Sequence, residues 1–190
     1  WVDDGQAEKL DVRAVTGGVT ILPRHINDVT PLGMGAATVT CDGSDRLAAA
    51  VGARSLKPGK DLLIIDAGTC VTYEVIDALG NYWGGNIAPG MHMRLRALHE
   101  FTAKLPLVEA EGAVPGRGYD TDTAIRSGVR RGMKYGIEGY IRSMRAKYPK
   151  LLVFLTGGDK INFDTTIKSI IFADKFIVPR GLNKILDYNN

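Results

Sequence analysis

The stretch LLIIDAGTCVTYEV, residues 62–75, decides the fold of this 190-residue chain. Its first four residues are apolar without interruption, which is typical of a strand buried on both faces of a sheet. Residues 69–77 alternate between apolar and polar side chains, which predicts a second strand with one face toward the core. The turn between these strands, Asp66 to Thr69, carries a carboxylate, a glycine and a hydroxyl group.

Helix and strand patterns alternate over the chain around this stretch, whereas residues 1–44 give no clear pattern. In chain order we expect a helix at 47–56, strands at 62–66, 69–77 and 82–87, helices at 91–103 and 121–147, strands at 151–155 and 172–178, and a short final helix. This order predicts an α/β fold with a mixed sheet, either as one domain or as two lobes of the same design.

The composition excludes several classes of protein. A hydrophobic fraction of 45% and a charged fraction of 24% are typical of a folded globular chain rather than a disordered one. No apolar run approaches the roughly 20 residues that span a bilayer, so we do not expect a membrane protein. Cys41 and Cys70 lie far apart without paired spacing, and no signal peptide is visible. We therefore expect a reducing, cytoplasmic location and neither a disulfide nor a zinc framework.

The formal net charge of +3 says little about partners, because most basic residues are scattered. One cluster lies on the predicted helix 121–147 and consists of Arg126, Arg130, Arg131 and Lys134. We expect a solvated helix face there. A nucleic-acid surface is the weaker alternative, since no aromatic platform or known reader motif accompanies the charges.

The turn DAGT, residues 66–69, is the strongest candidate for chemistry. An aspartate at the end of a buried strand can hold a cation, since carboxylate oxygens are ligands for hard cations. Gly68 allows backbone amides to approach a phosphate closely, and Thr69 adds a hydroxyl donor. A plain tight turn is the competing interpretation of this motif when it stands alone.

A second glycine turn, TGGD at residues 156–159, also follows a buried strand. Gly157 and Gly158 leave room for a flat ring or a sugar to press on the backbone. Two such turns at strand ends are typical of a nucleotide held between lobes, which strengthens the functional interpretation of both.

Two helix starts carry further candidates. In GSDR, residues 43–46, Asp45 is either an N-cap or a carboxylate that takes a hydroxyl proton, and Arg46 can hold an anionic group. Thr121, after Gly118-Tyr119-Asp120, is either a cap or a hydrogen-bond donor to a substrate. His92 and His99 lie seven residues apart, and we expect surface or packed histidines rather than metal ligands.

Together and in this order, these elements resemble the type III pantothenate kinase family, of the superfamily of acetate and sugar kinases, heat-shock chaperone ATPases and actin. The resemblance rests on GSDR (43–46), DAGT (66–69), GGNIAPG (84–90), Thr121 with Ala124, Ile125 and Gly128, TGGD (156–159), residues 94–107 and the ending 172–186. It covers about residues 43–190. It implies two ribonuclease H-like or actin-like lobes with mixed β-sheets, residues 1–60 being a remnant of the N-terminal lobe and residues 61–190 the C-terminal lobe.

The resemblance also implies roles for individual residues. Asp45 would accept the proton of the pantothenate hydroxyl, and Asp66 would bind the monovalent cation, potassium or ammonium, that the family requires. The residues that would hold pantothenate are Gly43, Ser44, Arg46 and Thr121. Those that would contact ATP are Gly68 and Thr69 at the phosphates and Gly157 and Gly158 near the adenosine.

The first part of the chain departs from the family pattern. An N-terminal strand with an Asp-x-Gly-Asn-Thr phosphate loop is expected and no such run occurs, and the substrate-contacting tyrosine expected shortly before Gly43 is also missing. The chain opens at Trp1 rather than at a methionine. Either the first lobe is damaged or residues of it lie outside this sequence. We expect the latter, because the second lobe shows no decay.

The function implied by the resemblance is the ATP-dependent phosphorylation of pantothenate to 4'-phosphopantothenate, the first step of coenzyme A biosynthesis. It would use Mg²⁺ and K⁺ or NH₄⁺, and the protein would be a homodimer with no nucleic-acid or membrane partner. One alternative is a non-catalytic relative acting as a binding or regulatory protein, similar to Bvg accessory factor. Another is a different phosphotransferase or a phosphohydrolase of the same superfamily, since a fold alone does not set the substrate.

Overall fold

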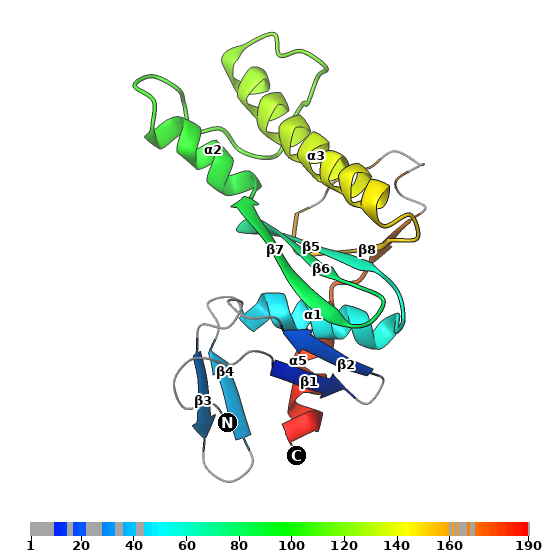
Figure 1. The fold of residues 1–190 in the computed structure, drawn as a ribbon. Coiled ribbons are helices and arrows are strands. Elements are labelled where there is room, and N and C mark those ends of the chain that lie inside the picture. Colours follow the sequence, from blue (N-terminus) through cyan, green and yellow to red (C-terminus); the bar gives the residue numbers. More distant parts are fainter. Residues whose placement is uncertain are drawn as a thin grey trace.

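The computed structural model describes residues 10–14, 17–21, 28–32, 36–40, 44–159, 161, 163, 167 and 170–189. Its centre is a seven-stranded sheet in the order β1-β2-β7-β6-β5-β8-β9 (Figure 1). The strands are β1 Leu10–Ala14, β2 Gly17–Ile21, β5 Leu62–Ala67, β6 Cys70–Ile76, β7 Asn81–Pro89, β8 Leu152–Thr156 and β9 Ile171–Ala173. A separate pair consists of β3 Asp28–Leu32 and β4 Ala36–Thr40. The sheet mixes parallel and antiparallel pairs, so the predicted α/β class with a mixed sheet is confirmed.

Strand β5 is deeply buried in the sheet, as its apolar run predicts. Its residues Leu62 to Ile65 are fully buried. It pairs antiparallel with β6, where Leu63 lies opposite Val75, and parallel with β8, where Leu63 lies opposite Val153. An element with neighbours on both edges and helices on both faces has no polar side available, which explains the absence of alternation in its sequence.

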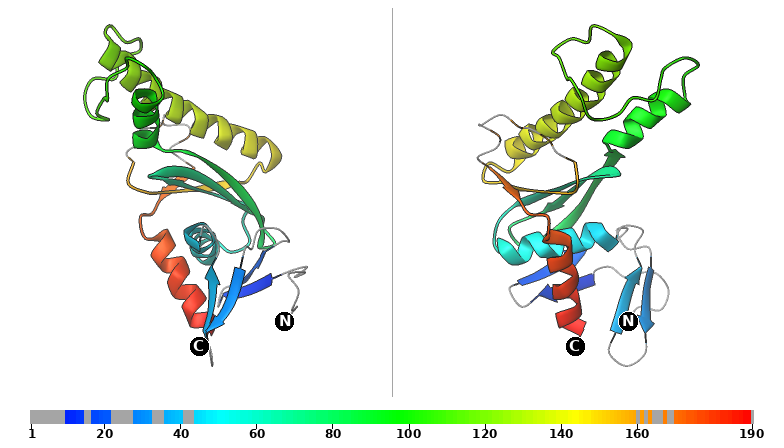
Figure 2. Two further views of the ribbon diagram at one scale, coloured as in Figure 1. Left: turned by 90° about the vertical axis from the view of Figure 1, so that its left-hand side faces the viewer. Right: turned by 180° about the vertical axis from the view of Figure 1, so that it is seen from behind.

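Helices cover both faces of the sheet (Figure 2). Helices α2 (Met91–Glu100) and α3 (Thr121–Lys147) pack on the face that carries Leu63, Ile65 and Tyr73. Helices α1 (Ser44–Leu56) and α5 (Ile177–Asn189) lie on the other face, with Leu62, Ile64 and Ile76. Successive strand residues point to opposite faces, so β5 contributes to both cores. None of the described helices is long and apolar enough to cross a membrane.

The end of the chain differs from the expectation. The strand predicted at 172–178 is confined to β9, and α5 begins at Ile177. The carboxylate of Asp174 accepts a hydrogen bond from the backbone N–H of Phe176 at 2.8 Å, a local turn that leads the chain out of the sheet. Helix α2 also ends at Glu100, three residues before the expected end.

The basic cluster on α3 is not the solvated face that we expected. Arg126, Arg130 and Arg131 donate hydrogen bonds to the backbone carbonyls of Glu109, Ala110 and Pro115 respectively. These carbonyls belong to the irregular segment 101–120 between α2 and α3. A segment rich in glycine and proline has many carbonyls without a partner in regular structure, and the arginines satisfy some of them. The cluster therefore fastens this segment to α3.

Candidate active site at the end of the central strand

Three chain segments meet at the end of β5, around the turn formed by Asp66 to Thr69. The backbone N–H of Gly90, after β7, donates to the carbonyl of Thr69 at 3.0 Å. The backbone N–H of Asp159, after β8, donates to the carbonyl of Ala67 at 2.9 Å. The structure therefore brings together the two glycine turns that the sequence places 90 residues apart, and with them Gly68, Thr69, Gly157 and Gly158.

The glycines of these turns differ in what surrounds them. Gly157 has a φ of +98°, and a Cβ built on it would lie 2.2 Å from the carbonyl oxygen of Ala67. A side chain is therefore excluded there by both conformation and space. A Cβ built on Gly68 or Gly158 would meet nothing within 4 Å. The backbone at these two positions is accessible, which is the property that a phosphate or a nucleoside ring needs for close approach.

Asp66 lies in β5, one residue before its end, on the face of the sheet that α1 and α5 cover. It lies opposite Thr72 of β6 and Thr156 of β8. Directly opposite residues share a face, so the carboxylate is flanked by two hydroxyl side chains. Asp66 is half-buried and makes at least one polar contact. Oxygen ligands of this kind fit a hard cation.

The described residues contain no group of three or more His, Cys, Asp or Glu side chains that could hold a metal ion. A divalent ion enclosed by protein carboxylates therefore does not fit the described part of this site. One carboxylate supplemented by hydroxyl and carbonyl oxygens fits a monovalent cation, and also a divalent ion held mainly by substrate phosphates.

Asp159 is a member of this site to which the sequence assigned no role. Its carboxylate oxygen Oδ2 is buried, and no hydrogen-bond partner for it occurs among the described residues. Its backbone is bonded to Ala67, next to Asp66. A buried carboxylate oxygen without a protein partner is costly, so this atom is a second candidate for a cation contact.

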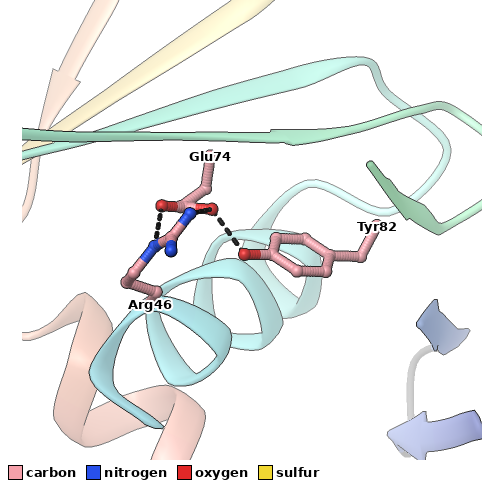
Figure 3. A network of polar contacts seen from close by, with 3 residues as sticks. All are labelled: Arg46, Glu74 and Tyr82. Atoms are coloured by element: carbon pink, nitrogen blue, oxygen red, sulfur yellow. Dashed lines mark hydrogen bonds and ion pairs between the residues drawn. The ribbon is translucent and has the colours of Figure 1, made fainter. Parts of the chain in front are cut away.

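Arg46 forms an ion pair that the sequence did not predict (Figure 3). It lies in the first turn of α1, and its Nε and Nη2 donate to the two carboxylate oxygens of Glu74, the second bond measuring 3.0 Å. The hydroxyl of Tyr82 donates to the same carboxylate. Glu74 is fully buried and Tyr82 nearly so. The hydrogen bond to Glu74 outweighs partial burial and raises the pKa of Arg46.

The alternating pattern of β6 contained a signal for this network. Glu74 falls on the polar side of the alternation, which is normally the solvated side. Because α1 covers that side, the glutamate has to be paired. A charged residue in a strand next to a strand that has helices on both faces therefore indicates a buried ion pair or hydrogen bond. The pattern does not identify the residue that pairs with it.

The other residues of GSDR are described only in part. Ser44 and Asp45 are the first two residues of α1, and neither of their side chains nor Gly43 lies within the described part of the structure. The bond from Arg46 to Glu74 holds this first turn of α1 over β6. Thr72 lies two residues before Glu74 on the same face and opposite Asp66. The turn of α1 and the DAGT turn therefore lie on one face of the sheet.

Thr121 is not an N-cap. The cap of α3 is Asp120, whose carboxylate accepts from the backbone N–H of Thr123 at 2.7 Å in a capping box. Thr121 is exposed at the end of α3 that points away from the sheet (Figure 1). Helix α3 and Arg46 lie on opposite faces of the sheet, so a single chain does not bring Thr121 to GSDR. His92 and His99 are both exposed, and Nδ1 of His99 bonds to the carbonyl of Leu105 at 2.8 Å.

Known proteins match most of this chain. A family model described as type III pantothenate kinase matches residues 18–143. A type III pantothenate kinase of Bacteroides fragilis is 64% identical over 148 residues, which are 78% of this chain and 61% of that protein. A relative of the same name from Azobacteroides pseudotrichonymphae is 49% identical over 158 residues, covering 83% of this chain and 64% of that protein. The chain thus spans about three-fifths of the length of these curated relatives.

A solved structure supports the fold. A protein of Campylobacter jejuni titled as a conserved Baf family transcriptional activator aligns with a TM-score of 0.55 at 23% identity. The alignment covers 79% of this chain and 66% of that chain. At this identity the likeness concerns the fold alone, and it agrees with the predicted α/β class.

Proposed function

The chain belongs to the type III pantothenate kinase family, and on that basis we propose that the protein transfers a phosphoryl group from ATP to pantothenate. The products are 4'-phosphopantothenate and ADP, and the reaction is the first step of coenzyme A biosynthesis. The observation that carries the proposal is the match of the family model over residues 18–143, which includes GSDR and DAGT. The meeting of the two glycine turns at Asp66 supports it.

We assign the candidate residues to the two substrates as follows. Gly68 and Thr69 contact the phosphates of ATP, and Gly157 and Gly158 lie near the adenosine. Support comes from the open space at Gly68 and Gly158 and from their shared position at the end of β5. The residues assigned to pantothenate are Gly43, Ser44, Arg46 and Thr121.

In the transfer step, the pantothenate hydroxyl oxygen attacks the γ-phosphorus of ATP as the bond to the bridging oxygen of ADP breaks. Asp45 accepts the hydroxyl proton. Phosphoryl transfer depends mostly on in-line positioning and on neutralising the charge of the moving group, so Asp45 contributes less than the positioning residues.

We propose that Asp66 holds a monovalent cation, K⁺ or NH₄⁺, and that Mg²⁺ accompanies ATP. Bound there, these cations would neutralise phosphate charge. The proposal is supported by the position of the Asp66 carboxylate between Thr72 and Thr156 and by the buried oxygen of Asp159. We also propose a cytoplasmic location. ATP is available there, and the reducing conditions of the cytoplasm would keep the free Cys70 thiol reduced.

We also propose a homodimer in which α3 of one protomer packs on α3 of its partner. Gly128, Gly132 and Gly136 recur every four residues, and a Cβ built on any of them meets nothing within 4 Å. Thr121, seven residues before Gly128, falls on the same face of the helix. A partner docked on this face would place Thr121 at the contact between the protomers, and we propose that Thr121 takes part in substrate binding there.

The function is tested by a coupled assay of ADP release with the protein as encoded, ATP, Mg²⁺ and K⁺, with and without pantothenate. We expect pantothenate-dependent ADP, and we expect Asp45→Asn to lower kcat by roughly 10²-fold while the Kd for ATP stays within twofold. Equal losses in kcat and ATP affinity would assign Asp45 a structural role at the start of α1. A folded protein without pantothenate-dependent ADP would contradict the kinase function.

A further inference from the structure

We propose that Glu74 and Tyr82 are positioning residues that fix Arg46, and with it the first turn of α1, for the phosphoryl acceptor. The inference rests on the proposed kinase function and adds two residues to the site that would carry out that function. Neither residue belongs to GSDR or to either glycine turn, and both come from strands rather than from the loops around the site.

The contacts of Glu74 hold Arg46 in one orientation. Both carboxylate oxygens are engaged by the guanidinium group, one by Nε and one by Nη2, and the Tyr82 hydroxyl binds the second oxygen (Figure 3). A two-point contact with a planar guanidinium group fixes its plane as well as its position. Because Glu74 uses the N–H of Nε and one N–H of Nη2, it leaves both N–H groups of Nη1 and the second N–H of Nη2 for another acceptor.

The burial of the network indicates a purpose beyond stability. The Glu74 side chain is 1% exposed and that of Arg46 is 23% exposed. Desolvating such a pair costs about as much as the pair returns, so apolar side chains in place of the whole network would serve the fold equally well. The neighbours Ile64 and Ile76 show that this face of the sheet accepts apolar side chains. An ion pair retained here is therefore better explained by the geometry it imposes on Arg46.

The register of the strands connects the network to the rest of the site. On β6, Glu74 follows Thr72 by two residues, a step of about 7 Å along a strand, and Thr72 lies opposite Asp66. The carboxylate that anchors Arg46 is thus fixed to the sheet beside the strand that ends in the DAGT turn. Since Asp45 directly precedes Arg46, anchoring Arg46 sets the distance between the backbone of Asp45 and that turn.

The test compares three variants of the protein as encoded. Tyr82→Phe removes one hydroxyl from the network, Glu74→Gln removes its charge, and Tyr140→Phe is the matched control. Tyr140 stacks on Tyr73 with ring centroids 4.0 Å apart and lies on the face of the sheet that α3 covers. It therefore lies across the sheet from Arg46, and its change to phenylalanine removes the same hydroxyl group as Tyr82→Phe.

Steady-state kinetics give the first readout. We expect Tyr82→Phe to raise the KM for pantothenate about fivefold, the equivalent of one lost hydrogen bond, and Glu74→Gln to lower kcat/KM for pantothenate about 10²-fold. The KM for ATP should stay within twofold in both, and Tyr140→Phe should change neither constant. Thermal melting of all three variants separates folding from positioning. Folded Tyr82 and Glu74 variants with an unchanged KM for pantothenate would overturn the inference, and so would equal changes in both KM values.

A second readout does not require kinase activity. In ¹⁵N NMR spectra, the Nε–Hε signal of Arg46, assigned with Arg46→Lys, should exchange slowly with water in the parent and at least tenfold faster in Glu74→Gln. Unchanged exchange would overturn the inference whether or not the protein is a kinase. A slow signal in a protein without pantothenate-dependent ADP release would instead contradict the proposed function and leave the anchoring of Arg46 standing.

Discussion

At the scale of single residues, Gly157 and Gly158 allow a direct test of the geometry of the site. Gly157→Ala would place a methyl group 2.2 Å from the Ala67 carbonyl at a φ of +98°, whereas the same change at Gly158 meets open space. We expect Gly157→Ala to lower the free energy of unfolding by about 2 kcal/mol or more and Gly158→Ala by less than about 0.5 kcal/mol. Urea denaturation of both variants measures this difference, and similar losses in the two would contradict it.

Asp66 is the residue at which the cation proposal is tested. Asp66→Asn keeps the size of the side chain and removes its charge, so the fold should be preserved. We expect the K⁺ concentration for half-maximal activity to rise about tenfold, which corresponds to about 1.4 kcal/mol of cation binding. A K⁺ titration at constant ionic strength, balanced with a bulky organic cation, measures it. A K⁺ response identical to that of the parent would remove Asp66 from the cation site.

The sequence predicted the backbone part of the site better than its side-chain contacts. Gly68, Thr69, Gly157 and Gly158 follow predicted strands, and strand ends that share an edge of a sheet meet by geometry. The ion pair of Glu74 with Arg46 could not be predicted in this way. It joins residues 28 positions apart through the packing of a helix on a sheet, and local pattern contains no information on that packing.

At the scale of elements, the start of α3 gives a prediction about pH. Hydrogen bonds from the side chain and the backbone of Thr123 lower the pKa of Asp120 below its ordinary value of 3.8. A carboxyl group with a lowered pKa stabilises the folded state above its ordinary pKa, and this contribution is lost as the pH falls through the lowered value. We therefore expect the capping box to open only below pH 3.8.

The amide signal of Thr123 in ¹⁵N NMR spectra reports this opening, because the amide donates to the titrating carboxylate. We expect a titration midpoint below 3.8 in the parent and no titration in Asp120→Asn. A midpoint at or above 3.8 would contradict the lowered pKa.

The sequence did not identify Asp120 as the N-cap of α3, because Thr121 and Asp120 are both common N-cap residues and sequence alone does not choose between them.

The long helix and the central strands were predicted well, and the end of the chain was not. The expected helix 121–147 coincides with α3, whose apolar stripe Ile125, Val129, Met133, Ile137 and Ile141 is buried as predicted. Residues 172–178 were wrongly predicted as one strand, because two short apolar stretches around Asp174 and Lys175 are compatible with a strand or a helix. The bond between Asp174 and the Phe176 amide decides the outcome, and it is a local turn that hydrophobic pattern does not reveal.

At the scale of the whole molecule, the division of the chain into two lobes at residue 60 stays a prediction. The packing of α1, which belongs to the first predicted lobe, connects it to the second. Leu47, Val51 and Ala53 of α1 are buried in one core with Ile64 of β5 and Ile177 of α5. The helix whose first turn contains Arg46 therefore packs directly on the sheet that carries DAGT. This arrangement places Arg46 and the proposed phosphate residues on one packed scaffold, which favours precise positioning over movement between them.

The dimer is the prediction that concerns the whole protein. Gly132→Leu would place a branched side chain in the middle of the exposed glycine face of α3, where two backbones are proposed to meet. Leucine favours a helix more than glycine does by about 0.8 kcal/mol, so the variant should retain its fold and its melting temperature. We expect analytical ultracentrifugation to show a dimer for the parent and a monomer for Gly132→Leu.

Arg145→Leu is the matched control, because it adds the same side chain to an exposed position of α3 that helical spacing puts about 140° away from Gly132. It should leave the dimer intact.

If Thr121 acts in the partner's site, the monomeric Gly132 variant should also lose affinity for pantothenate. Its Kd for ATP should be unchanged, since the residues proposed to bind ATP all belong to the glycine turns of one chain. A monomeric variant with full pantothenate affinity would separate the dimer from substrate binding and would return Thr121 to an ordinary exposed position in the first turn of α3.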